Sequence, residues 1–167
     1  MAASTRDRML LSTALLIRER GARATSIDDV LAHSDAPRGS VYHHFPGGRE
    51  QLLREATEMA ADYVVAQIER GDDPVVVLDA LMEQLHPGCP VMAVAVEDGT
   101  EAQAAAGVAF ARWQDALERL GVPRDRALLV IAAVEGAIVM ARAQKDTSPL
   151  DSVRDQLHDL LKGDLAS

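Results

Sequence analysis

The stretch of sequence that decides the fold is residues 25–52, TSIDDVLAHSDAPRGSVYHHFPGGREQL. Its apolar residues recur at helical spacing and predict one helix over 26–33 and a very short one over 37–43. Ser26 and Asp29, three residues apart, form a variant of the capping box that marks a helix start. Because only a three-residue turn separates the two helices, the stretch has the spacing of a helix-turn-helix.

Helical spacing continues over nearly the whole chain, and no segment alternates as a half-buried strand would. A first helix is predicted over 5–20, and a long helix over 49–70 follows the break at residues 45–48. Five more helices are expected over 74–86, 90–98, 101–120, 124–144 and 149–162. Gly- and Pro-containing breaks separate these helices, at 71–74, 86–88, 98–99, 121–123 and 147–149. The predicted fold class is therefore all-α, with about nine helices.

The charge is distributed unevenly along the chain. With 17 basic and 26 acidic residues among 167, the net charge is −9, which by itself argues against nucleic acid as a partner. Residues 1–54, however, contain eight arginines and six acidic residues, a balance of +2, and the remainder carries −11. The basic part is the part that contains the helix-turn-helix, as expected of a nucleic-acid-binding module attached to an acidic body.

Several classes of protein are excluded by what the sequence lacks. A single cysteine, Cys89, rules out an intrachain disulfide framework and a cysteine-rich zinc site. No nucleophile–base pair, metal-ligand set or glycine-rich phosphate loop is present, so we expect no enzyme activity, no cofactor and no metal. The N-terminus is interrupted by charges and lacks the apolar core of a signal peptide. The apolar stretch 127–141 is split by Glu135 and falls short of the roughly 18 residues of a membrane span. These features predict a soluble, cytoplasmic protein.

The second helix of the helix-turn-helix is expected to lie in the major groove of DNA with its first residues at the base edges. Arg38 offers two parallel donors to a guanine, and Gly39 permits a close backbone approach. Tyr42 and His44 are placed to reach phosphate oxygens, and Arg49 adds positive charge at the start of the long helix. The alternative for Tyr42 is an ordinary core aromatic. The candidate DNA-contacting residues are Thr25, Ser26, Pro37, Arg38, Gly39, Ser40, Tyr42, His43, His44 and Arg49.

Residues 25–31 and 37–52 resemble the DNA-binding domain of TetR-family transcriptional regulators. Residues 88–97, 135–137 and 141–143 are similar to the effector-binding domain of the LmrA/YxaF-type subgroup. The resemblance implies a helix-turn-helix domain over 1–48 and an effector-binding and dimerisation domain over 49–167. Three positions depart from the family pattern: Asp35, where glycine is common, Pro37, where serine or threonine is usual, and Arg49, where lysine is usual.

In such a bundle, adaptable or large apolar side chains are expected to line a ligand cavity, although each of them is also a candidate for ordinary core packing. These candidate ligand-binding residues are Met59, Tyr63, Met82, Met92, Phe110 and Trp113. Cys89 precedes an expected helix start, where a thiol is either a redox sensor or a small packed residue.

The helix over 124–144 is apolar nearly all round, so it must be covered on both sides, and in a small protein a second subunit covers one of them. The candidate interface residues on this helix and the last one are Leu128, Ile131, Val134, Ile138, Val153, Leu157 and Leu160. The alternative is that they form core within one chain.

These features, with the resemblance, predict a homodimeric transcriptional repressor that a small, largely apolar effector releases from a pseudo-palindromic DNA operator. The alternative is a small-molecule binding or sequestering protein whose helix-turn-helix no longer engages DNA.

Overall fold

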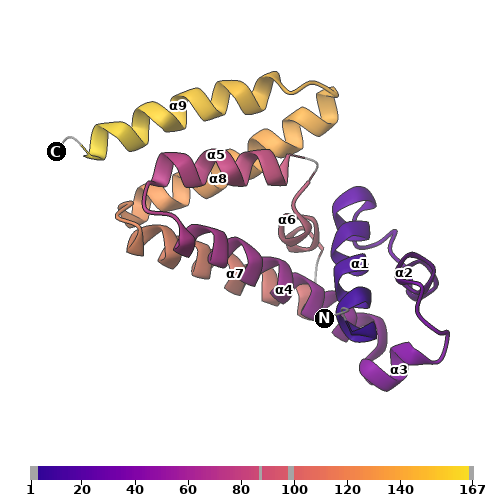
Figure 1. The fold of residues 1–167 in the computed structure, drawn as a ribbon. Coiled ribbons are helices and arrows are strands. Elements are labelled where there is room, and N and C mark those ends of the chain that lie inside the picture. The colour runs from indigo at the N-terminus through magenta and orange to yellow at the C-terminus, as the bar shows by residue number, and fades with distance from the viewer. Residues whose placement is uncertain (1–3, 87, 98–99, 166–167) are drawn as a thin grey trace. The chain divides into compact units, whose positions relative to one another are not determined.

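The computed structural model describes residues 4–86, 88–97 and 100–165 and is entirely helical within them (Figure 1). The helices of the described residues are α1 (Thr5–Arg20), α2 (Ile27–Ser34), α3 (Ser40–His44), α4 (Gly48–Arg70), α5 (Pro74–Leu85), α6 (Pro90–Ala95), α7 (Glu101–Arg119), α8 (Arg124–Gln144) and α9 (Ser148–Leu165). The predicted all-α class is confirmed. The breaks expected at Pro87 and at Asp98-Gly99 lie outside the described residues.

The start of α3 differs from the expected one. Pro37 was expected to begin the helix, but residues 37–39 form a turn and α3 begins at Ser40. The Ser40 backbone N–H and hydroxyl both donate to the Pro37 carbonyl, at 2.9 and 2.6 Å. These bonds close a tight turn ahead of the helix, so α3 has only five residues.

The ends of α2 follow local rules. The Asp29 N–H donates to the Ser26 hydroxyl at 3.2 Å, and the Ser26 N–H donates to the Asp29 carboxylate at 3.0 Å, which confirms the predicted capping box. At the other end Asp35 adopts the left-handed conformation (φ 51°) that glycine takes in many helix C-caps. Asp tolerates this conformation better than most side chains, so its departure from the family pattern does not disturb the turn.

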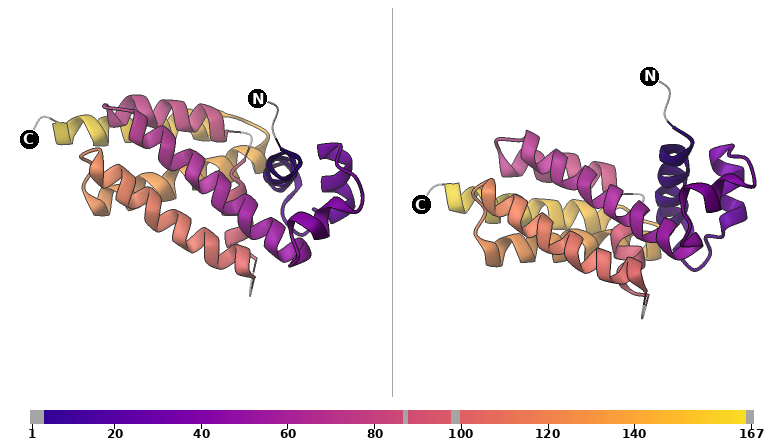
Figure 2. Two further views of the ribbon diagram at one scale, coloured as in Figure 1. Left: turned by 60° about the horizontal axis from the view of Figure 1, so that its bottom comes forward. Right: turned by 90° about the horizontal axis from the view of Figure 1, so that it is seen from below.

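The chain divides into two compact units (Figure 2). Unit 1 comprises residues 1–61 and 90–109, and unit 2 comprises residues 62–89 and 110–167. Helices α4 and α7 each contribute residues to both units. This division by contacts places residues 90–109 with the N-terminal helices, whereas the expected functional boundary at residue 48 stays a prediction.

In unit 1, α1 packs against both α2 and α6. Its core includes Met9, Val41 and Phe45, all 0% exposed. The Arg6 guanidinium lies 5.2 Å from the centre of the Phe45 ring and covers one of its faces. Phe45 therefore ties the end of α3 to the core of the unit.

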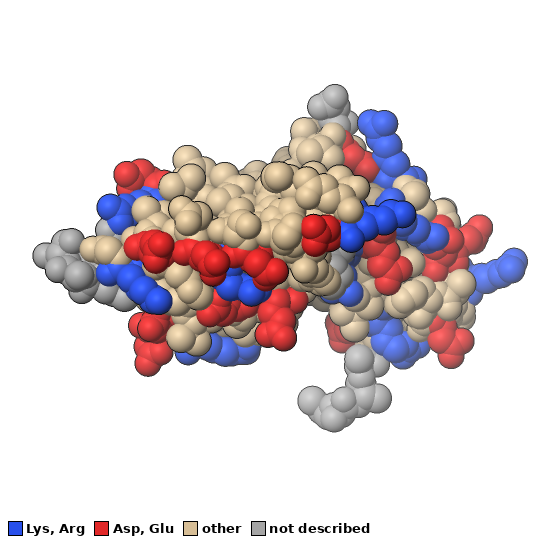
Figure 3. All heavy atoms as spheres, turned by 90° about the horizontal axis from the view of Figure 1, so that it is seen from above, with Lys and Arg blue, Asp and Glu red and all other residues tan. Residues whose placement is uncertain are grey.

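In unit 2, α9 packs against both α5 and α8. The Asp79 carboxylate of α5 lies 2.7 Å from the His158 ring of α9, and Arg154 lies 3.5 Å from the same carboxylate. Figure 3 shows charged side chains of both signs bordering an uncharged area of this unit's surface.

Helix α8 is long and apolar enough, by length and composition alone, to cross a membrane, with an 18-residue window of mean hydropathy 1.7. The apolar stretch 127–141 lies within this helix, which continues beyond it at both ends. Core helices of soluble proteins meet the same criterion, and 39% of this window is buried.

Replacing Phe45 with alanine is expected to reduce the free energy of unfolding by about 3–4 kcal/mol, since it removes a fully buried ring from the unit 1 core. Urea denaturation at fixed protein concentration measures the change. Tyr42→Ala on the same short helix is the matched control and should cost less than about 0.5 kcal/mol, because Tyr42 is exposed. Equal losses for the two variants would contradict this account of the core.

Candidate nucleic-acid interface and ligand cavity

Helix α3 and the turn before it present a continuous exposed surface. Pro37, Arg38, Gly39 and His43 are exposed and Tyr42 is 65% exposed. Ser40 and His44 are half-buried beside them. Because Val41 and Phe45 point into the core, the opposite face of this short helix must face outward. Seven of the ten predicted DNA-contacting residues therefore lie on one surface, which we call the α3 surface.

Arg38 differs from other arginines of unit 1. Arg6 pairs with Glu55, and Arg20 pairs with Asp29 at 2.9 Å. Among the described residues, by contrast, the Arg38 guanidinium has no hydrogen bond or ion pair. Its five donors stay available for an external acceptor, which is what recognition of a guanine or a phosphate requires.

The turn between α3 and α4 requires glycine at Gly48. Gly48 has φ 64° and is buried, and a Cβ atom there would lie 3.6 Å from the Tyr42 ring. Only glycine takes this left-handed conformation without strain. The Gly47 N–H donates to the Gln51 side-chain oxygen at 2.8 Å, so the first turn of α4 closes back on the loop. The Gly-Gly pair therefore has a structural role in this turn.

Two predicted DNA contacts have structural roles instead. Thr25 is buried, and its hydroxyl donates to the Gly21 carbonyl at 2.9 Å. The Arg49 Nε donates to the Thr25 carbonyl at 3.0 Å, and its Nη2 donates to the Ala22 carbonyl. Thr25 is a predicted DNA-contacting residue, but its side chain is turned inward and holds the loop between α1 and α2. Arg49 joins the start of α4 to the same loop.

Ser26 is exposed, but its hydroxyl is engaged in the capping box of α2. Hydrogen bonds from the Ser26 side chain and backbone, together with Arg20, lower the pKa of Asp29 to about 2. The carboxylate is thus ionised at neutral pH and complements the N-terminal dipole of α2. Ser26 therefore shapes this helix start.

A segment distant in sequence supports the helix-turn-helix. The Arg23 backbone N–H donates to the Glu97 carboxylate at 2.8 Å, and the Glu101 backbone N–H donates to the Glu50 carboxylate at 2.8 Å. Arg54 lies 3.2 Å from the Glu101 carboxylate. Sequence reasoning missed these contacts, because nothing in the local pattern of residues 90–101 indicates a partner near residue 23.

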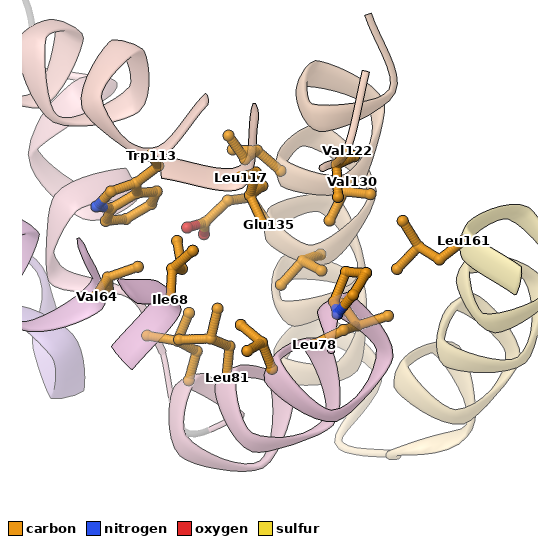
Figure 4. Close-up of a pocket in the computed structure, with 15 residues that line it drawn as sticks. Val64, Ile68, Leu78, Leu81, Trp113, Leu117, Val122, Val130, Glu135 and Leu161 are labelled. Atoms are coloured by element: carbon orange, nitrogen blue, oxygen red, sulfur yellow. The ribbon is translucent and has the colours of Figure 1, made fainter. Parts of the chain in front are cut away.

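Unit 2 contains a cavity of about 40 Å³ that opens to solvent, and the empty space within and in front of it, solvent included, is about 520 Å³. Its walls come from α4, α5, α7, α8 and α9, together with Val122 before α8 (Figure 4). The residues that line it are Val64, Ile68, Pro74, Val77, Leu78, Leu81, Leu85, Trp113, Leu117, Val122, Val130, Ile131, Val134, Glu135 and Leu161.

Of the six residues predicted to line a ligand cavity, the structure places only Trp113 in this wall. Met82 is fully buried in the core, and Met59 packs against the core of unit 1. Tyr63 is 46% exposed and accepts a hydrogen bond from the Gln84 amide. Phe110 packs edge-to-face on Trp113 with ring centres 5.4 Å apart.

Met92 is half-buried in unit 1 and is not among the residues that line this cavity. The expectation was wrong for these five residues because it rested on residue type. The cavity is lined instead by aliphatic side chains whose inward direction depends on how the helices pack.

The cavity contains one acidic side chain that sequence reasoning did not place there. Glu135 is 8% exposed, and neither of its carboxyl oxygens has a hydrogen-bond partner of ordinary geometry among the described residues. Burial raises its pKa to about 7, and the Cys89 thiol nearby opposes the shift. The sequence did contain one indication of this residue, because an acidic side chain in the middle of an apolar helix is unusual. In the sequence it indicates an interruption of the apolar stretch and does not identify a site.

The predicted dimer residues divide between core and surface. Val134, Ile138 and Leu157 are buried within the chain, and Ile131 lines the cavity, so these four were assigned to the interface wrongly. Leu128 is exposed, and Val153 and Leu160 are half-buried. One face of α8 is nevertheless apolar and exposed; we call it the α8 stripe, and it consists of Leu128, Leu129, Ala132, Gly136, Val139, Met140 and Ala143.

Replacing Glu135 with glutamine is expected to remove a pH dependence of stability. The unfolded carboxyl ionises near pH 4.5 and the folded one near 7, so unfolding becomes easier as pH rises through this window. This group then costs the folded state about 3 kcal/mol above pH 7. Relative to the wild type, the free energy of unfolding of E135Q should therefore rise by about 3 kcal/mol as the pH increases from 4.5 to 8.

Urea denaturation across this pH range measures the gain. The exposed Glu83→Gln in the same unit is the control, and its difference from the wild type should stay nearly constant. A parallel pH profile for E135Q and the wild type would show that Glu135 is not the buried acid described above.

Family models match both parts of the chain. Residues 10–56 match the model of bacterial regulatory proteins of the tetR family. Residues 78–156 match the C-terminal domain of LmrA/YxaF-like transcriptional regulators. The α3 surface falls within the first match, and most of the cavity-lining residues fall within the second.

Relatives match over nearly the full length. The HTH-type transcriptional regulator Rv0196 of Mycobacterium tuberculosis is 45% identical over 96% of this chain and 95% of its own. The HTH-type transcriptional regulator LmrA of Bacillus subtilis is 29% identical over 95% of this chain and 97% of its own. Neither match is confined to the helix-turn-helix.

Among solved structures, a TetR transcriptional regulator from Chloroflexus aurantiacus superposes with a TM-score of 0.73 at 27% identity, covering 92% of this chain and 91% of that one. A TetR regulator from Legionella pneumophila shares the fold with a TM-score of 0.80 at 21% identity, covering 96% and 98%. The fold, the exposed α3 surface and these relatives agree: the chain belongs to the TetR family of bacterial transcriptional regulators, with a C-terminal domain of the LmrA/YxaF type, and is a DNA-binding regulator and not an enzyme.

Proposed function

We propose that this regulator is a homodimeric repressor that binds a pseudo-palindromic operator through its α3 surface and leaves it when an effector enters the unit 2 cavity. The observation that carries the proposal is the α3 surface itself, where Arg38 and Tyr42 are exposed and have no partner among the described residues. Its place of action is the cytoplasm, where the operator is.

DNA recognition follows from the chemistry of this surface. Arg38 reads a guanine through paired hydrogen bonds, and Gly39 beside it leaves room for the groove wall. Tyr42 and His44 bind phosphate oxygens and set the orientation, and Ser40 and His43 supply further polar contacts. In a dimer, two such helices read half-sites about 34–36 Å apart.

The α8 stripe is the proposed dimer interface. An exposed apolar helix face of this length is unfavourable in water, and a second copy of the same face would bury it under two-fold symmetry. A Cβ atom at Gly136 would have no protein atom within 4 Å, so the small residues at the centre of the stripe leave space for the partner helix to approach closely. Val153 and Leu160 on α9 extend this interface at its edge.

Response to an effector requires that the ligand bind the DNA-bound and released states with different affinity. Helix α4 runs continuously from Arg49, beside the helix-turn-helix, to Val64 and Ile68 in the cavity wall. Cys89, which interacts with Glu135, is followed directly by α6, and α6 packs on α1. These two chain segments are the proposed carriers of the coupling.

Replacing Tyr42 with alanine is expected to weaken operator binding about a hundredfold, because each subunit loses a phosphate hydrogen bond of about 1.5 kcal/mol. The operator is first isolated by selecting genomic fragments with purified protein, and fluorescence anisotropy then measures the affinity. Tyr63→Ala is the matched control, since Tyr63 is also exposed but lies in unit 2. Wild-type affinity in the Tyr42 variant would place the DNA contact elsewhere.

The same selection separates the proposed function from a protein that only sequesters small molecules. Operator binding carried by phosphate contacts must weaken steeply as salt is added. A protein that retains no genomic fragment in a salt-dependent way would support sequestration.

Replacing Val139 with glutamate is expected to weaken dimerisation by at least about tenfold, because it buries a charge at the centre of the α8 stripe. Sedimentation velocity over a concentration series measures the dimer dissociation constant. Val76→Glu on α5 is the matched control, another exposed valine that lies outside the stripe. If V139E remains as dimeric as V76E, the interface is not on this face.

A further inference from the structure

Glu135 stands out among the residues of the cavity wall. The other lining residues are aliphatic, proline or tryptophan, so Glu135 is the one ionisable side chain that the described residues place there. Figure 4 shows its carboxyl group directed into the space between Trp113 and Ile68. A single ionisable group therefore dominates the chemistry of an otherwise apolar cavity.

The carboxyl group is not satisfied by the protein. Both oxygens are buried and lack a hydrogen-bond partner of ordinary geometry among the described residues. Burying such a group without donors is unfavourable, and it is tolerated where a ligand or another donor completes the site. The Cys89 thiol, the polar side chain that interacts with it, is a weak donor and leaves acceptor positions open.

The chemistry that completes this site can be specified. An ammonium group brings N–H donors and the opposite charge, and charge-assisted hydrogen bonds of this kind are the strong ones. The face of the Trp113 indole adds a favourable surface for a cation. An alcohol brings one donor without charge, and an anion would be repelled.

We propose that the cavity binds an apolar organic molecule carrying one protonated amine, with the ammonium held by Glu135 and the hydrocarbon body packed among the aliphatic walls. One carboxyl group matches one positive charge, which favours a monoamine. That this ligand is the effector rests on the proposed function; that the cavity selects an amine does not.

Binding of an ammonium has a consequence for protons. With a pKa of about 7, Glu135 in the empty cavity is partly protonated at neutral pH, and an ammonium ion that binds to the protonated form displaces the carboxyl proton to solvent. The elements facing Glu135 from α4, α5, α7 and α9 present only uncharged side chains in the cavity wall, and the Cys89 thiol is the other titratable neighbour. Amine affinity should therefore rise as pH increases from 6 to 8.

Three probes of equal size test the inference: 4-phenylbutylamine, 4-phenyl-1-butanol and 4-phenylbutanoate. Trp113 is the only tryptophan of the chain and lies in the cavity wall, so its fluorescence reports binding directly. At pH 8 we expect the amine to bind at least about tenfold more tightly than the alcohol, and the carboxylate more weakly than either.

The variant E135Q should bind the amine at least about tenfold more weakly, bind the alcohol within about threefold of the wild type, and lose the rise of amine affinity with pH. Glu83→Gln, an exposed acid in the same unit, should retain all three properties. Unfolding by urea confirms that E135Q is folded, so a lost preference cannot be attributed to a lost structure.

Equal affinity for the amine and the alcohol, an unchanged preference in E135Q, or no response of Trp113 to millimolar amine would each overturn the inference. Operator release is measured separately by anisotropy. If the amine binds with the stated preference but leaves the operator complex intact, the proposed effector response fails while the chemistry of the cavity stands.

Discussion

The position of the α3 surface, which is the proposed DNA-binding surface, depends on the burial of two side chains, Val41 and Phe45. A five-residue helix is not stable in isolation, because the conformational entropy lost in forming its first turn outweighs the free energy that its few hydrogen bonds contribute. Val41 and Phe45 anchor α3 in the core of unit 1, and the turn at Gly47-Gly48 sets its exit. Arg38 and Tyr42 are outward-facing as a result, and they point in a defined direction only as long as this core is intact.

Helix α8 shows how one apolar sequence meets two different demands. Its inner face fills the core of unit 2 and part of the cavity wall, and its outer face is the exposed α8 stripe. A helix sequence that is apolar on all sides thus does not show which side is buried and which side is exposed. Leu128 and Val134 are both branched hydrophobic residues on this helix, yet one is exposed and the other is buried.

Glu135 illustrates the conflict between burial and charge. Burial in an apolar cavity raises the pKa of this residue to about 7. A bound cation can therefore ionise the carboxyl group near neutral pH. Buried acids of this kind reduce the stability of the folded chain, and they cluster at functional sites. The proposed function assigns the effector to the cavity and DNA to the α3 surface, and each assignment rests on its own contacts.

The sequence by itself determined the helices, the capping of α2, the left-handed turn at Asp35 and the family, because each depends on residues that are neighbours in the chain. It also indicated the proposed DNA-contacting residues of α3 and the turn before it, since they follow from the spacing of a helix-turn-helix. Only the tertiary structure decided that Thr25 is turned inward, that Arg49 joins α4 to the loop after α1, and which residues line the cavity. Those outcomes depend on which helix faces meet, and residues far apart in sequence settle that together.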